Sequence, residues 1–222
     1  SARVNVADLY NNLGNFFFKK NQYDQAIENY EHALTHGLDD SKSTQISVAN
    51  SHYNLGHAYE NNKQYGKAIE HYDKAIEHYE KALEIRLNIF GTNHSDLANS
   101  YYNLGMSYYN NKQYDKSIEY YEKALKISLD IFGTNHSDVA WSYHGLGDSY
   151  YRNKQYDKSV EYYEKALKIR LDIFGTNHSD LADSYYSLGL SYYYNRQYDK
   201  AIEHREKALK IWKELFGDTD RL

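Results

Sequence analysis

Apolar and small residues recur along the chain with the spacing of an α-helix that packs along one face. In the segment 98–139 this face holds Tyr101, Leu104, Gly105 and Tyr108, which lie three, one and three residues apart. The pattern predicts one helix over about 95–109 and a second over about 114–132. A polar turn of four residues, Asn-Asn-Lys-Gln, separates them. Because this connection is short, the two helices must lie antiparallel, as a hairpin.

The second predicted helix ends at Gly133, a candidate left-handed C-terminal cap. The residues that follow, from Thr134 to Asp138, contain several side chains that can cap the start of the next helix. We therefore expect one hairpin to follow directly on another.

The hairpin pattern occurs five times. A Leu-Gly pair marks each copy, and the glycines are 42, 49, 42 and 42 residues apart. No single hairpin can bury its apolar face alone, so the copies are expected to stack. The predicted fold class is all-α: a right-handed α-solenoid of five helical hairpins, forming one domain over residues 1–222. The repeats are placed at about 7–48, 49–97, 98–139, 140–181 and 182–217.

The spacing of 49 has a visible cause, a tandem copy of seven residues. Residues 68–74 read AIEHYDK and residues 75–81 read AIEHYEK. Seven residues are close to two helical turns, so the copy lengthens the predicted helix 64–90 while rotating its faces by only about 20°. Two outcomes stay open: the helix projects past the stack, or the flanking repeats separate and exchange partners with another chain.

These repeats resemble the tetratricopeptide repeat, a family of helical hairpins that bind other proteins. An aromatic residue, Leu-Gly and Tyr on the first helix meet small, aromatic and small residues on the second. The period of 42 residues and the linkers FGTNHSDLA and FGTNHSDVA are similar to the kinesin-light-chain type. Two features depart from that type: serine follows each linker histidine where proline is usual, and the first repeat reads HGLDDSKSTQISV at 36–48. The residues that carry the resemblance in the third repeat are Tyr101, Leu104, Gly105, Tyr108, Ser117, Tyr121 and Ala124.

Composition narrows the range of functions. The chain has 26 basic and 31 acidic residues, a net charge of −5, which argues against nucleic acid or an anionic membrane as partner. It has no cysteine, which excludes a disulfide scaffold, a thiolate nucleophile and a Cys-ligated zinc site. No apolar run approaches the roughly 20 residues of a membrane span, and no signal peptide opens the chain. We expect a cytoplasmic protein.

No pattern of catalytic residues stands out from the repeats. Charged residues recur once per repeat and so form ladders rather than one unique pocket, and no phosphate-binding loop or nucleophile–base set is present. His32 and His36 lie four residues apart on a helix but lack a third ligand for a metal. The chain is therefore predicted not to be an enzyme, with no cofactor and no metal.

The first helices vary along one stripe. Repeats three and four differ at eight positions, and five of these lie opposite the packing face of the first helix. The stripe carries Trp, Tyr, Met and His, residue types frequent in binding hot spots. The resemblance implies that first helices line a concave groove, so we name this stripe the groove face. Its candidate peptide-binding residues are Asn50, Tyr53, Asn54, His57, Asn61, Asn99, Tyr102, Asn103, Met106, Asn110, Trp141, His144, Asp148, Arg152, Asp183, Tyr186, Leu190 and Tyr194.

The expected function is a protein-interaction scaffold whose groove face holds an extended peptide or protein segment. Asn54 and Asn103 are candidates for contacts to a peptide backbone, since an amide both donates and accepts. Aromatic and apolar members would form side-chain pockets, whereas the charged ones would set charge preference and register.

Two alternatives stay open: neutral drift of an exposed face, and a self-assembling or structural array, natural or designed. In such an array near-identical repeats would stack head to tail into a homo-oligomer. The chain ends in GDTDRL, without an obvious polar capping helix. The helix 64–90 offers a second route to oligomers, by exchange.

Overall fold

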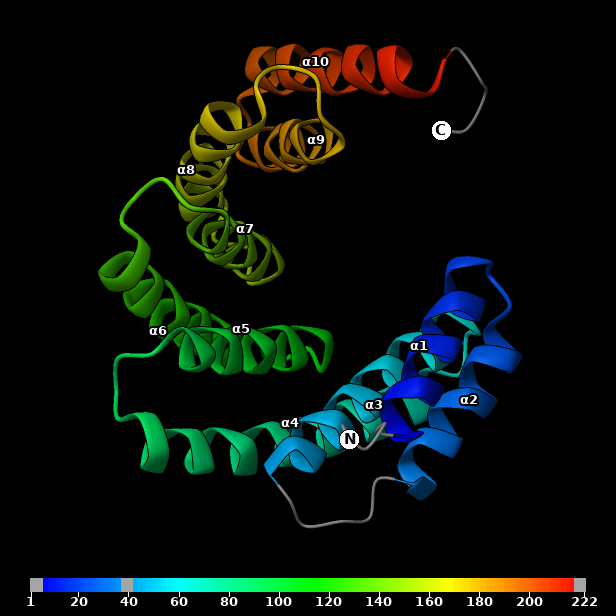
Figure 1. Cartoon of the computed structure of the whole chain (residues 1–222). Helices are drawn as coiled ribbons and strands as arrows, with labels where there is room; N and C mark the ends of the chain where they lie inside the picture. The colour runs from blue at the N-terminus through cyan, green and yellow to red at the C-terminus, as the bar shows by residue number, and fades with distance from the viewer. Residues whose placement is uncertain (1–5, 37–41, 218–222) are drawn as a thin grey trace. The chain divides into compact units, whose positions relative to one another are not determined.

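A computed structural model of the chain describes residues 6–36 and 42–217, with side chains for all of these except residues 42–45. Over these ranges the fold is all-α and consists of ten helices and their connections (Figure 1). The helices pair in chain order, α1 with α2, α3 with α4, α7 with α8 and α9 with α10. Their bounds are α1 Val6–Lys19, α2 Tyr23–His36, α3 Lys42–Asn61, α4 Tyr65–Phe90, α5 Ser95–Asn110, α6 Tyr114–Phe132, α7 Ser137–Arg152, α8 Tyr156–Phe174, α9 Ser179–Tyr194 and α10 Tyr198–Phe216.

The predicted fold class of five helical hairpins is confirmed, and so are the predicted helices of the third repeat. The predicted bounds 95–109 and 114–132 match α5 and α6 to within one residue. Residues 37–41 of the atypical first linker, and residues 218–222 of the GDTDRL ending, lie outside the described ranges. None of the helices that the structure describes is both long enough and apolar enough to cross a membrane.

The described chain falls into two compact units. The first contains α1 to α4 and residues Met106–Gln113, and the second contains Asn93–Gly105 and the chain from Tyr114 onward. Helix α5 therefore contributes its first part to the second unit and its last turn to the first. Each unit is described below by itself.

Each long linker ends one helix and caps the start of the next within a few residues. Gly133 adopts a φ of 75°, a left-handed conformation that costs glycine little, and ends α6. His136 is the N-cap of α7, because its Nδ1 accepts a hydrogen bond from the backbone N–H of Asp138 at 3.2 Å. The Phe132 ring stacks on the His136 ring with centroids 4.1 Å apart. The linker motif is thus accounted for by local structure.

Within each of the first four hairpins, a tyrosine of the second helix lies directly on a glycine of the first. A Cβ atom added to Gly105 would lie 2.8 Å from Cδ1 of Tyr121, and one added to Gly147 would lie 2.6 Å from Cδ1 of Tyr163. The rings are buried, with at most 3% of either tyrosine exposed. Glycine is required here because the ring occupies the space of a side chain.

The seven-residue copy lengthens one helix, as predicted. Helix α4 has 26 residues, whereas α6, α8 and α10 have 19 each. The copy also duplicates a histidine onto one face of α4, where His71 and His78 lie on either side of His52 from α3. The ring centroids of His52 lie 5.3 Å from His71 and 5.4 Å from His78. Tyrosine pairs such as Tyr101 with Tyr120 take this place in the third hairpin.

Burial, together with repulsion from the other two histidines, lowers the pKa of His52 to about 3. The nearby Lys74 lowers this pKa further, and Glu70 opposes the shift. Burial also lowers the pKa values of His71 and His78. The cluster is therefore neutral in the folded protein at pH values where unfolded histidine is already charged.

We predict that the free energy of unfolding falls as the pH drops below 6.5. The unfolded chain takes up a proton at His52 near pH 6.5, whereas the folded chain does not until about pH 3, so acid favours unfolding. This one histidine accounts for a loss of about 2 kcal/mol between pH 7.5 and pH 5. Urea unfolding at several pH values measures it. His52→Gln should flatten the dependence, and the exposed His32→Gln is the matched control; equal slopes for all three proteins would contradict the prediction.

Candidate functional site

The 18 predicted residues of the groove face lie on the first helices α3, α5, α7 and α9, and none is in the buried core. Each is either exposed or partly exposed, which leaves it reachable from solvent. The most exposed aromatic members are Trp141, Tyr186 and Tyr194, with 42%, 41% and 49% of their surface exposed. Other aromatic rings of the described chain are exposed too, but these three lie on the variable stripe and are of the residue types most frequent in binding hot spots. The exposed members are Asn61, Asn99, Trp141, Arg152, Asp183, Tyr186 and Tyr194, and the partly exposed ones are Asn50, Tyr53, Asn54, His57, Tyr102, Asn103, Met106, Asn110, His144, Asp148 and Leu190.

Three predicted residues form a polar and aromatic cluster in the first unit. The Asn110 amide donates a hydrogen bond to the Tyr53 hydroxyl at 3.2 Å and lies 3.3 Å from Nε2 of His57. The Tyr53 and His57 rings meet edge to face with centroids 4.6 Å apart. Burial lowers the pKa of His57, so its ring is neutral near pH 7.

The predicted asparagines of α3 have partners within the protein. The Asn54 amide donates to Oδ1 of Asn15 at 3.3 Å in an exposed contact. Asn50 accepts a hydrogen bond from the Tyr79 hydroxyl at 2.5 Å, a contact made possible by the seven-residue copy. An exposed amide contact exchanges readily for one to a ligand, so Asn54 stays the better candidate for holding a peptide backbone.

In the second unit a buried arginine holds the groove face of α7 in place. Arg170 of α8 is 2% exposed, and its Nη1 donates to Oγ of Ser184 at 2.5 Å and to the carbonyl of Asp180 at 3.3 Å. The same nitrogen lies 3.3 Å from Nδ1 of His144. The guanidinium lies 4.6 Å from the centre of the Trp141 ring, a cation–π distance. This arginine is therefore in contact with two of the predicted residues.

Burial also shifts the titration of this cluster. It lowers the pKa of His144 against the pull of Asp148, and with that pKa lowered Nδ1 can accept from the arginine. Burial lowers the pKa of Arg170 as well, and Asp180, Tyr102, Asp148 and Asp183 counteract this. The arginine Nη2 is buried without a hydrogen-bond partner. The cluster is thus a cation embedded among carboxylates.

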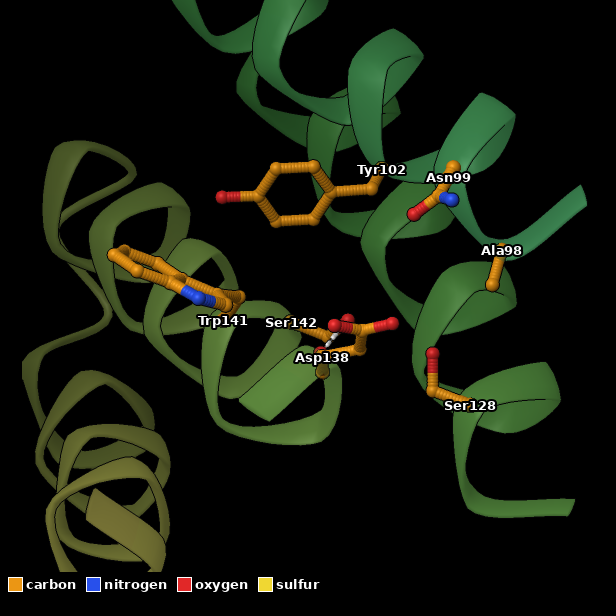
Figure 2. Close-up of a pocket in the computed structure, with 7 residues that line it drawn as sticks. All are labelled: Ala98, Asn99, Tyr102, Ser128, Asp138, Trp141 and Ser142. Atoms are coloured by element: carbon orange, nitrogen blue, oxygen red, sulfur yellow. Dashed lines mark hydrogen bonds between the residues drawn. The ribbon is translucent and has the colours of Figure 1, made fainter. Parts of the chain in front are cut away.

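The second unit also contains a cavity of about 260 Å³, which lies one repeat before the Arg170 cluster. Figure 2 shows the Tyr102 ring of α5 and the Trp141 ring of α7 flanking it, with Asp138 and Ser142 of α7 nearby and Ser128 of α6 below. Burial, and then the carboxylates of Asp148 and Asp138, raise the pKa of Tyr102 to about 12, while Arg170 lowers it. The cavity therefore lies in a negative electrostatic environment. Its lining residues are Ala98, Asn99, Tyr102, Ser128, Asp138, Trp141 and Ser142.

The sequence analysis missed the contribution of the second helices. The residue 30 positions after the repeat start is Ser128, Arg170 or Trp212 in the last three repeats. Ser128 lines the cavity and Trp212 lies 5.6 Å from the groove-face ring of Tyr186. The sequence does contain a signal for this position, because the change from Ser128 to Arg170 is one of the eight differences between repeats three and four.

One variable position of the first helices has a packing cause instead of a binding one. Gly145 replaces Asn103 of the preceding repeat, and a Cβ on Gly145 would lie 2.5 Å from Cζ of Tyr121. The glycine lets α7 approach that ring. Asp148, in contrast, uses its carboxylate to accept a hydrogen bond from Tyr163 within the groove face.

Among the described residues, no group of three or more His, Cys, Asp or Glu side chains is placed to hold a metal ion. The cluster of His52, His71 and His78 does not form such a site.

Comparison with protein families finds the tetratricopeptide repeat along almost the whole chain. One family profile of that description matches residues 5–77, 71–127 and 96–172, and a second matches residues 181–221. A comparison with curated proteins finds no match. The matched segments include every helix that carries the groove face.

Solved structures support the same fold. BtubC (BKLC) from P. vanneervenii is 24% identical with a TM-score of 0.68, over 98% of this chain and 85% of that one. A putative kinesin light chain from Podosopora anserina with nearly identical TPR-like repeats is 22% identical with a TM-score of 0.67, over 97% and 99% of the two chains. The apo form of RapI is 19% identical with a TM-score of 0.62, over 94% and 71%. Because all three identities are below 25%, the similarity to these structures shows a shared fold and nothing more.

We predict that Arg170→Ala lowers the free energy of unfolding by about 3 kcal/mol, because it empties a packed site and removes the hydrogen bonds of a buried cation to Ser184 and Asp180. Chemical denaturation measures the loss. Ser128→Ala, at the equivalent position one repeat earlier, is the matched control and should change stability by less than about 1 kcal/mol. Similar losses for the two variants would show that the arginine contacts do not stabilise the second unit.

Proposed function

Because the chain belongs to the tetratricopeptide repeat family, we propose that it is a non-enzymatic scaffold that binds a peptide or protein segment along its groove face. The observation that carries this proposal is the exposure of Trp141 and Tyr186 on first helices whose opposite faces are packed. Exposed aromatic rings supported from behind lose little side-chain entropy on binding, which favours their use as anchors.

Both anchors are supported by neighbouring cations. The Arg170 guanidinium lies against Trp141, and Arg205 lies 5.5 Å from the centre of the Tyr186 ring. The Tyr186 ring also lies against Trp212. A preorganised ring of this kind does not have to be ordered by its ligand, so more of the contact energy is available for affinity.

Polar groups around Trp141 and Tyr186 would orient the bound segment. Asn99 and Asp183 are exposed beside the aromatic residues, and Asn54 makes one exchangeable contact. Amides can pair with the backbone of an extended peptide without regard to its side chains, whereas the carboxylates select for charge. These features support the binding of an extended segment, and a cytoplasmic location is a further part of the proposal.

We predict that the double variant Trp141→Ala with Tyr186→Ala loses binding to peptides selected by display on the wild-type protein. Removing two hot-spot aromatics should weaken binding about 1,000-fold, at roughly 2 kcal/mol per ring when their effects are additive. Fluorescence anisotropy with one selected peptide measures this. The matched control is Lys126→Ala with Lys168→Ala, exposed on the second helices. Unchanged binding by a folded double variant would contradict the proposal.

A second candidate, head-to-tail assembly of copies, is favoured by apolar residues at each end. Helix α1 exposes Leu9, Leu13 and Phe16, at repeat positions that are buried in the following repeats. Helix α10 exposes 58% of Ile202, whereas its equivalents Ile118 and Val160 are buried. Two faces of this kind would bury each other in a heterologous contact, the arrangement that propagates.

We predict on this second candidate that the apparent mass rises with protein concentration, because association follows mass action. Light scattering across a concentration series measures the mass. Leu9→Glu with Phe16→Glu should restore a constant monomer mass, and the Lys126→Ala, Lys168→Ala control should not. A monomer at every concentration would rule out the assembly and leave the peptide-binding proposal untouched.

A further inference from the structure

The cavity between α5, α6 and α7 has a filled counterpart one repeat later. Adding 42 to the numbers of its lining residues Asn99, Tyr102, Asp138 and Ser142 gives Trp141, His144, Asp180 and Ser184. All four of these are contacts of the Arg170 guanidinium. Arg170 itself is the counterpart of Ser128. The cavity is therefore the place that an arginine side chain fills in the next repeat.

We propose that this cavity, which we name the guanidinium pocket, receives the side chain of an arginine from a bound peptide. The inference rests on the proposed function and specifies part of its ligand. Ser128 lines the cavity but its side chain is too short to fill it, so the chain does not fill its own pocket here. The occupant enters instead from the side of the groove face, where Asn99 and Trp141 are exposed.

The hydrogen-bond acceptors in the pocket match those that already bind a guanidinium. Ser142 donates its hydroxyl proton to the carbonyl of Asp138 at 2.8 Å, and Ser184 does the same to Asp180 at 2.7 Å. In the later repeat both of these oxygens also accept from Arg170. The serine hydroxyl is thus oriented with its lone pairs toward the incoming N–H groups.

The cavity is lined by more aromatic rings than the site around Arg170, and such rings suit a flat cation. Tyr102 and Trp141 stand where His144 and Asp183 stand in the next repeat, and their rings flank the opening (Figure 2). A planar guanidinium stacks on such rings while donating in its own plane, which an ammonium cannot do as well. This geometry favours arginine over lysine.

The surrounding charge is also complementary to a cation. The carboxylates of Asp138 and Asp148 act on Tyr102, and those of Asp148, Asp180 and Asp183 act on Arg170. Three carboxylates therefore act on the buried guanidinium, and Asp138 adds a fourth negative charge at the cavity. A second guanidinium, separated from Arg170 by the Trp141 ring, brings the local charge closer to balance.

A capped arginine tests the pocket without any peptide partner. The probe is Nα-acetyl-arginine methylamide, and the neutral isostere Nα-acetyl-citrulline methylamide is its control. The chain has two tryptophans, so their indole N–H resonances report separately on Trp141 in the pocket and on Trp212 outside it. We expect a saturable shift at Trp141 only, with affinity for the citrulline probe at least tenfold weaker. No shift at Trp141, or equal affinities, would overturn the proposal.

Ser128→Arg supplies the matched variant, because it places the chain's own guanidinium where Arg170 lies one repeat later. We expect it to remain folded and to abolish the Trp141 shift. Ser128→Leu fills the same space without charge and serves if the arginine variant fails to fold. Persistence of the shift in a folded, filled variant would place the probe elsewhere and overturn the proposal.

Peptide display on the wild-type protein separates this inference from the proposed function. Enrichment of arginine at one position, lost on Ser128→Arg, supports both. Peptides that depend on Trp141 and Tyr186 but tolerate replacement of arginine by citrulline support the scaffold and overturn the guanidinium pocket. A display that yields no peptide counts against the scaffold alone, and the arginine titration then decides on the pocket.

Discussion

Contact between a tyrosine ring and a glycine backbone sets the distance between the two helices of a hairpin. Tyr121 lies on Gly105 and Tyr163 lies on Gly147, so close that a single added carbon atom would overlap the ring. The fixed approach commits one face of each first helix to packing. The opposite face is then held at a constant position without itself being needed for stability, which is the condition for varying it between repeats.

The last hairpin shows what replaces this contact. Arg205 stands in α10 where the other second helices have tyrosine, and its Cγ occupies the space next to Gly189. Its guanidinium extends to the Tyr186 ring on the groove face. In the fourth hairpin Arg170 likewise reaches Trp141 from α8. Second helices thus contribute to the groove face from beneath, through long side chains that pack and carry charge at the same time.

Much of the fold could be predicted from the sequence because the same helix-packing and helix-ending residues recur in successive repeats. The bounds of α5 and α6 and the left-handed Gly133 follow from periodicity and from glycine chemistry. The N-cap could not be singled out, since several linker side chains are able to cap and the choice of His136 depends on stacking with Phe132. The role of Ser128 was missed because it depends on which residues of the next hairpin surround it, and no single helix contains that information. The exposed positions of the groove-face residues are compatible with peptide binding, which stays a prediction.

The duplicated heptad in α4 shows that the length of a second helix and the direction of its side chains can be set separately. Because seven residues nearly complete two turns, the copy placed His78 in line with His71 against the same histidine of α3. An insertion of five residues would instead have rotated every later side chain of α4 by about 140°, turning its apolar row to solvent. Lengthening a helix by seven residues therefore keeps its side chains pointing in nearly the same directions. Small duplications can in this way produce repeats whose second helices differ in length.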